Sequence, residues 1–169
     1  MLFCGRKIRI PTTHKKMVHF LGEYEVTLDA KGRFLLPAGF KKQLPEESLR
    51  FVVNRGFEKC LTLYPPQSWE PLFAKISTLN DFDPKVRAFR RQFLGGASEV
   101  EADSAGRLLL PPTLRDFAGL TKNVILVAAV DKIEIWDADT YKKIFEEFSA
   151  DGFSELAREV MVKPQEKND

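Results

Sequence analysis

Two arginines in the sequence are each the last residue of the same short turn motif, Asp-x-x-Gly-Arg. The motif spans residues 29–33 (DAKGR) and returns at residues 103–107 (DSAGR). The aspartate of such a motif can accept hydrogen bonds from nearby backbone amides, and the glycine permits a positive φ. The arginine that leaves the turn carries a planar, permanently charged guanidinium. That group can bind a phosphate or a guanine edge through two parallel hydrogen bonds.

Arg33 and Arg107 are the side chains that we assign to contact with DNA, at a base edge or at a phosphate. A tight turn holds its side chain clear of a sheet and lets the backbone approach a groove. Lys31 is assigned an added phosphate contact. Because the second turn has Ala105 at the position of Lys31, we expect the two turns to contribute unequally.

Asp29 and Asp103 have the wrong charge for contact with a phosphate. We expect these two carboxylates, together with Gly32 and Gly106, to brace the turns and to hold the arginines in position. The alternative is that each Asp–Arg pair is only a salt bridge that stabilises its own turn. The residues of the motif by themselves leave that alternative open.

The two turns belong to an internal duplication. Residues 29–37 match residues 103–111 at six of nine positions. The similarity continues on both sides, in these pairs of segments: 20–22 with 93–95, 51–53 with 125–127, and 61–64 with 133–136. The turn before the last pair is two residues shorter in the second copy under this alignment. Two copies are too few for a solenoid, so we interpret them as a pseudo-symmetric pair of β-rich modules.

Hydrophobic periodicity predicts the same elements in both copies. Alternation over residues 23–28 indicates a half-buried strand that leads into the first turn. Further strands are predicted at 33–36, 50–54, 60–64, 123–129 and 132–136, and short helices at 37–44 and 111–118. Longer helices are predicted after Pro66, after Asp83 as an N-cap, from Tyr141, and over 153–162. We expect the aromatic residues of these helices to pack on the sheets or on a neighbouring subunit.

Charge is distributed unevenly along the chain of 169 residues, whose net charge is +2. Residues 1–16 hold five basic and no acidic residues, which leaves the remainder with an excess of acidic groups. Any contact with DNA must therefore use individually placed cations rather than a general positive field. Residues 1–17 are expected to form a disordered basic extension, with Met17 as an alternative start and a DNA-embracing arm as a further possibility.

Residue types that would support an enzyme are scarce. The two histidines, His14 and His19, stand near the start of the chain, and the two cysteines, Cys4 and Cys60, have no metal-site spacing. No glycine-rich phosphate loop is present, and no apolar run approaches the roughly 20 residues that cross a bilayer. We therefore assign no catalytic residue, metal, cofactor, small-molecule substrate or membrane partner, and we expect a cytoplasmic protein.

Two other groups of basic residues have more than one interpretation. Lys41, Lys42 and Arg115 either extend a DNA-binding surface or are ordinary solvated charges. The three arginines within residues 87–91 could form a second DNA surface. A solvated or subunit-facing side of a helix is the alternative for that group.

The ordered pair of turns with both flanks resembles the MraZ family of the AbrB-like (SpoVT-AbrB) superfamily. The resemblance covers residues 18–148 and includes the segment FLGGASE at 93–99. It implies an α+β, β-rich fold, in which two repeats form a double-split β-barrel with helices between and after them. It also implies a ring-like homo-oligomer that binds short direct repeats in double-stranded DNA, upstream of the division and cell-wall gene cluster. The family typically represses its own operon, which implies a nucleoid-associated protein.

The resemblance suggests a division of the chain. The first SpoVT-AbrB-like repeat is expected at 18–70, linking helices at 71–93, the second repeat at 94–141, and C-terminal helices with a polar tail at 142–169. A rival function is an interaction module, antitoxin-like or scaffolding, that makes no contact with DNA, because a fold alone does not determine function.

Overall fold

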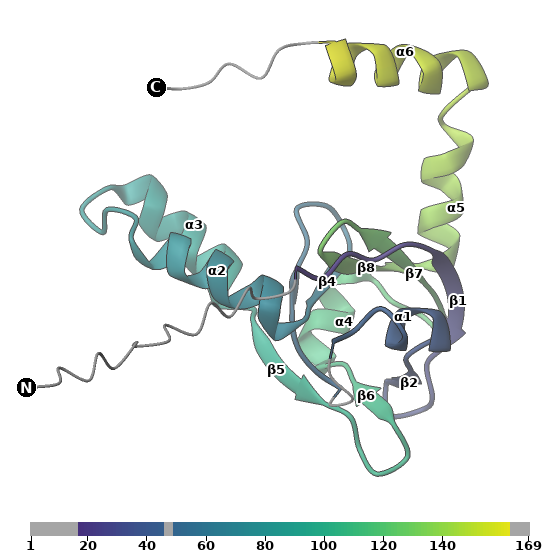
Figure 1. Ribbon diagram of the computed structural model, residues 1–169, viewed down its shortest axis with the longest axis horizontal. Helices are drawn as coiled ribbons and strands as arrows, with labels where there is room; N and C mark the ends of the chain where they lie inside the picture. Colours follow the sequence, from purple (N-terminus) through teal and green to yellow (C-terminus); the bar gives the residue numbers. More distant parts are fainter. Residues whose placement is uncertain (1–16, 46–48, 163–169) are drawn as a thin grey trace, which may run out of the picture.

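The computed structural model describes residues 17–45 and 49–162 of the chain. A compact body holds all the strands, and two pairs of longer helices project from it (Figure 1). The extension expected at residues 1–17, apart from Met17, and the tail at 163–169 lie outside the described residues. The expected mixed α+β class is confirmed. Helices nevertheless contain more residues than strands do, since four of them are long.

The two repeats contain the same elements in the same order. The first has β1 (Glu23–Thr27), β2 (Arg33–Leu35), α1 (Ala38–Lys41), β3 (Arg50–Arg55), β4 (Leu61–Tyr64) and α2 (Pro66–Ser77). The second has β5 (Ser98–Glu101), β6 (Arg107–Leu109), α4 (Pro112–Ala118), β7 (Asn123–Ala129), β8 (Lys132–Asp137) and α5 (Ala138–Glu146). Helix α3 (Pro84–Leu94) lies between the repeats, and α6 (Ala150–Val162) follows them.

The strands of the two repeats are exchanged rather than kept apart. A six-stranded sheet has the order β1-β7-β8-β4-β3-β5, and β2 pairs with β6 in a separate two-stranded sheet. Strand β1 of the first repeat pairs with β7 of the second, and β5 of the second pairs with β3 of the first. When each strand is replaced by its counterpart in the other repeat, the sheet reads β5-β3-β4-β8-β7-β1, which is the same order read from the opposite edge. The body therefore has an internal two-fold pseudo-symmetry.

The main core lies between the two sheets and is built from equivalent residues of both copies. Phe34 and Leu108, at the centres of β2 and β6, are 2% and 0% exposed. Phe40 of α1 and Leu114 of α4 are buried in the same cluster. Alternate residues of the strands thus point into this core, as the sequence predicts for a half-buried sheet.

One part of the internal alignment is wrong by one residue. Val52 lies opposite Tyr64, and Ile125 lies opposite the equivalent Trp136. The counterpart of Val52 is therefore Ile125, whereas the sequence comparison paired it with Leu126. Leu126 belongs to the main core, while Val52 and Ile125 point to the other face of the sheet. A slip of one residue exchanges the faces of a strand, so only the register could decide this pairing. The hairpin turn is consequently one residue shorter in the second copy, not two.

Helices α2 and α3 begin where the sequence predicts, whereas α5 and α6 each begin three residues earlier than predicted, at Ala138 and Ala150. Asp83 accepts a hydrogen bond from the Lys85 amide as the N-cap of α3, which confirms that prediction. Helix α2 starts at Pro66. Proline has no amide hydrogen, and the first turn of a helix tolerates this because amides there have no intrahelical acceptor. Tyr64, Ile76 and Phe93 form a second buried cluster where α2 and α3 join the sheet. Helix α6 has no buried residue among those described.

Candidate nucleic-acid interface

The first Asp-x-x-Gly-Arg turn is closed by its own aspartate. Asp29 Oδ1 accepts hydrogen bonds from the backbone amides of Lys31 and Arg33, at 3.0 and 2.9 Å. The amide of Gly32 donates to the Asp29 carbonyl at 2.9 Å, and Gly32 has a φ of +84°. The turn therefore needs a carboxylate at its start and a residue without a Cβ at its fourth position.

The same carboxylate holds the arginine side chain. Arg33 Nε donates to Asp29 Oδ2 at 2.7 Å. The second turn repeats the arrangement, since Arg107 Nε donates to Asp103 Oδ2 at 3.0 Å and Gly106 has a φ of +79°. The Nη1 and Nη2 atoms of Arg33 and Arg107 form no hydrogen bond with any described residue. Each guanidinium is thus fixed at one edge while its outer nitrogens remain able to bind.

The two aspartates are negatively charged at neutral pH. Hydrogen bonds from the Arg33 amide, from its side chain and from the Lys31 amide lower the pKa of Asp29, against a smaller opposing effect of burial. The pKa of Asp103 is lowered in the same way, first by the Arg107 amide. Ionised carboxylates would repel phosphate, which supports a bracing role for both residues.

The β2–β6 pairing brings the two turns together. Arg33 lies opposite Leu109, and Leu35 lies opposite Arg107. Arg33 Nη1 is 3.9 Å from Asp103 Oδ2, so the two Asp–Arg pairs form one group across the ribbon. In Figure 1 this ribbon lies at the end of the body farthest from α6. We call β2, β6 and the two turns, residues 29–35 and 103–109, the turn ribbon.

A basic side chain from the opposite repeat flanks each turn. The guanidinium of Arg115, on α4, lies so close to Gly32 that a Cβ added there would be 2.5 Å from its Cζ atom. Lys41, at the equivalent position on α1, has its Nζ 4.0 Å from the corresponding point on Gly106. Arg115 Nε is buried and has no hydrogen-bond partner among the described residues. Lys41 and Arg115 lie on the equivalent helices α1 and α4 of the two repeats, but the sequence contains no sign that each lies beside the other repeat's turn.

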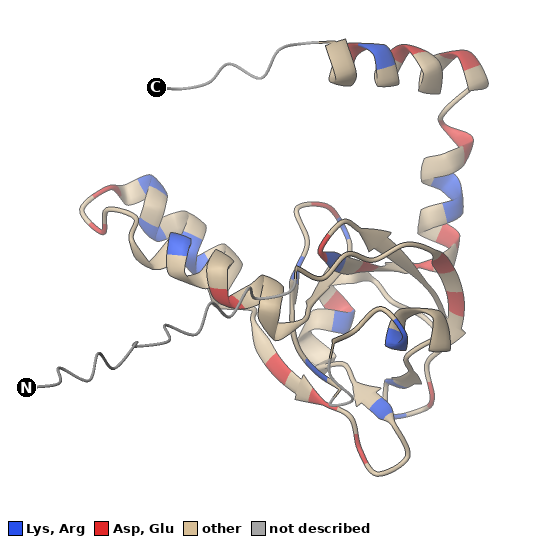
Figure 2. Ribbon diagram, in the orientation of Figure 1, with Lys and Arg blue, Asp and Glu red and all other residues tan. Residues whose placement is uncertain are grey.

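Lys31 and Lys42 are exposed, and neither forms an ion pair with a described residue. Lys31 projects from the first turn, where its backbone amide is bound to Asp29. Lys42 is the C-cap residue of α1 and makes no described contact with either turn. Figure 2 shows basic residues on several elements rather than on one continuous face, which agrees with the near-zero net charge.

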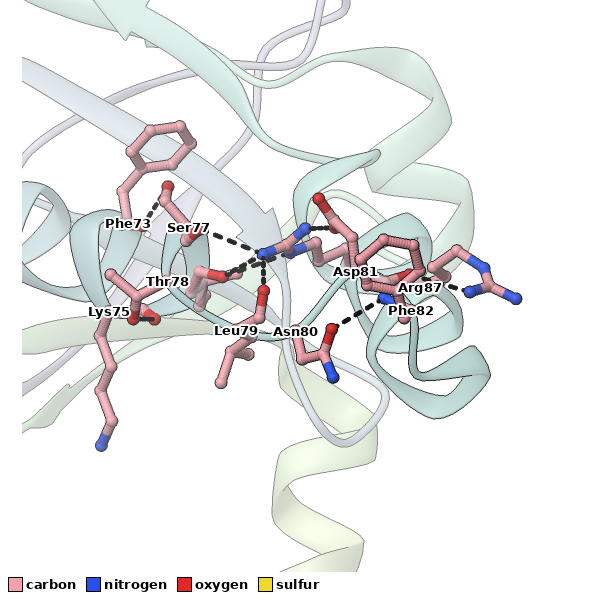
Figure 3. A network of polar contacts seen from close by, with 11 residues as sticks. Phe73, Lys75, Ser77, Thr78, Leu79, Asn80, Asp81, Phe82 and Arg87 are labelled. Atoms are coloured by element: carbon pink, nitrogen blue, oxygen red, sulfur yellow. Dashed lines mark hydrogen bonds and ion pairs between the residues drawn. The ribbon is translucent and has the colours of Figure 1, made fainter.

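The arginines of residues 87–91 are mostly occupied by the fold. Arg90 donates to three carbonyls at the C-terminal end of α2, those of Ile76, Ser77 and Leu79, and pairs with Asp81. Arg87 donates to the Asp81 carbonyl at 2.8 Å, within the network that Figure 3 shows around the α2–α3 connection. Carbonyls at a helix end lack intrahelical partners, and a cation there is stabilising. Arg90 is therefore a capping residue of the helical hairpin.

Other chemistry has little support in the described part of the chain. Burial raises the pKa of the Cys60 thiol to about 12, so this residue is protonated at neutral pH. Residues 17–45 and 49–162 contain no cluster of His, Cys, Asp and Glu side chains that could hold a metal ion. None of their helices combines the length and the apolar character required to cross a membrane.

Comparison with known proteins decides the family. Residues 19–92 and 93–163 each match the family described as "MraZ protein, putative antitoxin-like". The chain belongs to the MraZ family. The transcriptional regulator MraZ of Christiangramia forsetii is 44% identical over 147 residues, which cover 86% of this chain and 94% of that protein. The corresponding protein of Cytophaga hutchinsonii is 41% identical over 147 residues, covering 86% and 97%.

The family resemblance predicted from the two turns is thus confirmed over nearly the whole chain. A third relative, the transcriptional regulator MraZ of Thermomicrobium roseum, is 42% identical over 133 residues, 79% of this chain and 92% of that protein. Family membership places the chain among transcriptional regulators and not among enzymes. The two matched segments also confirm that the chain consists of two MraZ repeats.

Proposed function

We propose that the turn ribbon binds double-stranded DNA in a sequence-specific manner, with Arg33 and Arg107 at base edges or phosphates. The observation that carries the proposal is that both arginines lie on one ribbon with Nε fixed by a carboxylate, while their Nη atoms form no hydrogen bond with a described residue. A guanidinium held by a carboxylate is preorganised, so less side-chain entropy is lost when it binds. Lys31 adds a phosphate contact in the first turn only.

Lys41 and Arg115 extend this surface in the same proposal. Both side chains lie beside the turn of the opposite repeat. Each turn therefore has its own arginine and a second basic side chain that the other repeat supplies. Arg115 Nε is buried and has no hydrogen-bond partner among the described residues. A phosphate next to the first turn would balance its charge.

The finer features of the family complete the proposal. In this proposal the two repeats form a double-split β-barrel, and several copies form a ring that binds short direct repeats. A few cations per subunit bind weakly, and linking several sites can raise avidity by roughly 10²–10⁴. The protein then acts in the cytoplasm, on the nucleoid, as a repressor of its own division and cell-wall operon.

The test is fluorescence anisotropy with labelled DNA from the region upstream of the gene, compared with scrambled DNA at two salt concentrations. Each phosphate contact contributes about −0.9 to the slope of log affinity against log salt. Arg33→Ala with Arg107→Ala should abolish the preference for the upstream DNA. Arg91→Ala, which removes an exposed arginine of α3, is the matched control and should leave that preference intact.

An interaction module that makes no contact with DNA is the second candidate, favoured by the words "putative antitoxin-like" in the family description. It predicts equal affinity for upstream and scrambled DNA. It also predicts that the double arginine variant regulates normally in cells. Either result, obtained with a protein whose assembly state is unchanged, would contradict the DNA-binding proposal.

A further inference from the structure

The outer face of the turn ribbon carries two exposed leucines, which have no role in the proposed contacts of charged side chains with DNA. Leu35 is 55% exposed and Leu109 is 49% exposed. The residues that follow them directly after each strand, Leu36 and Leu110, are 2% and 0% exposed. Leu35 and Leu109 occupy equivalent positions in the two repeats, so both copies of the module place a large apolar side chain in solvent at the same point.

The register places each leucine beside an arginine of the other repeat. Leu109 lies opposite Arg33, and Leu35 lies opposite Arg107. Residues directly opposite in an antiparallel ladder share a face, and so do residues two apart on one strand. The four side chains therefore alternate on the outer face, while Phe34 and Leu108 between them point into the core.

The major groove of DNA matches this alternation. It admits a two-stranded β-ribbon, and its floor presents guanine acceptors for arginine and the thymine C5 methyl as an apolar group. Opposed residues of an antiparallel pair have Cα atoms about 4.5–5.5 Å apart. Stacked bases of one strand are about 3.4 Å apart. A paired arginine and leucine can therefore reach adjacent base pairs without bending either chain.

We propose that Leu35 and Leu109 contact the C5 methyl groups of thymines in the operator. Each of these thymines is next to a guanine bound by the arginine opposite, Arg107 for Leu35 and Arg33 for Leu109. This inference rests on the proposed DNA binding and adds a rule to it: the contacted bases are guanine–thymine neighbours, once for each half of the ribbon.

Uracil substitution tests the inference, because deoxyuridine lacks only the methyl group and keeps every hydrogen-bonding group of thymine. The upstream DNA is prepared with thymine and with uracil, and affinities are compared by anisotropy at one salt concentration. A buried methyl contributes enough for roughly a fourfold change in affinity. We expect that loss for each contacted thymine. Single substitutions then locate the positions, which should adjoin guanines.

Leucine variants separate this contact from a general effect of uracil. The double variant Leu35→Ala, Leu109→Ala should bind thymine DNA more weakly than the unaltered protein does. It should also bind thymine DNA and uracil DNA with equal affinity. Leu21→Ala, which truncates a leucine that is 79% exposed outside the ribbon, is the control and should retain the full difference. Light scattering on each variant reports whether the assembly state has changed.

The outcomes are distinct. Equal binding of thymine and uracil DNA by the unaltered protein overturns the methyl contact but leaves the DNA-binding proposal standing. The same result would follow if the leucines entered the minor groove, where no methyl is presented. A changed assembly state in the double leucine variant, with uracil sensitivity retained, would place the leucines between subunits and also overturn the inference. Failure to bind either DNA overturns the proposed function itself.

Discussion

The guanidinium of Arg115 packs against Gly32, although the two residues belong to different repeats. A Cβ on Gly32 would be 2.5 Å from Cζ, 2.6 Å from Nε and 2.7 Å from Nη1 of that arginine. The equivalent contact in the other half is looser, because Lys41 Nζ is 4.0 Å from the corresponding point on Gly106. The first turn is thus the more tightly enclosed of the two, and substitutions at the two glycines should differ.

Gly32→Ala should destabilise the protein more than Gly106→Ala. Both substitutions place a Cβ on a residue with positive φ, at a cost of about 1–2 kcal/mol. Only the alanine at 32 must also displace Arg115, since the space beside Gly106 is open to 3.9 Å. Urea unfolding of the two variants measures the difference. The extra loss should disappear when Gly32→Ala is combined with Arg115→Ala, and its persistence would contradict the contact.

Asp29→Ala should reduce the specificity of DNA binding rather than overall affinity for DNA. The variant releases Arg33 Nε and removes two backbone hydrogen bonds of the turn. It also removes a negative charge, which favours non-specific binding. We expect the ratio of affinities for upstream and scrambled DNA to fall roughly tenfold. Asp151→Ala, the same charge change on exposed α6, should leave the ratio unaltered. A similar ratio in both variants would support the purely structural salt bridge.

Asp137 should contribute to the decrease in the free energy of unfolding at acidic pH. Burial opposes its charge, but hydrogen bonds from the Thr121 side chain and amide and from the Thr140 amide lower its pKa overall. A lowered pKa gives stability that is present above the ordinary value of about 3.9 and is lost as pH falls through the folded value. Urea unfolding between about pH 5 and pH 2 should therefore show a shallower decline in Asp137→Asn. An unchanged slope would contradict this assignment.

Arg90→Ala should destabilise the α2–α3 hairpin without affecting DNA binding. The substitution leaves the carbonyls of Ile76 and Leu79 without their charged donor. Hydrogen bonds to a charged group are worth about 1.5–3 kcal/mol, and we expect a loss of that size. Arg91→Ala should remain within about 0.5 kcal/mol of the unaltered protein. A loss of operator affinity in a folded Arg90→Ala protein would restore the second DNA surface as an explanation.

Local chemistry explains why much of the site could be predicted. An Asx turn with a glycine of positive φ is determined by five consecutive residues, and both turns have the expected form. The Asp83 N-cap and the start of α2 depend on equally short segments. Contact with DNA by Arg33, Arg107 and Lys31 remains a prediction, because it concerns a partner that no intramolecular geometry contains.

The roles of the other basic residues could not be predicted, because they depend on distant partners. Arg90 and Arg91 are neighbours with the same charge, yet one caps α2 and the other is exposed. Arg115 and Lys41 are aligned residues, yet one is enclosed and the other open. Side-chain type and spacing carry no information on which carbonyl or glycine the fold will place nearby.

The amino-acid sequence alone determined the family, the duplication and the two arginine-bearing turns, because each is written in short contiguous segments. Tertiary structure decided what those segments face. Pairing of β2 with β6 joined the turns into one ribbon, and pairing of β3 with β5 exchanged strands between the repeats. Register also decided which leucines became exposed and corrected the alignment of Val52. A strand's partner and its register are set by packing over the whole body, which no local pattern specifies.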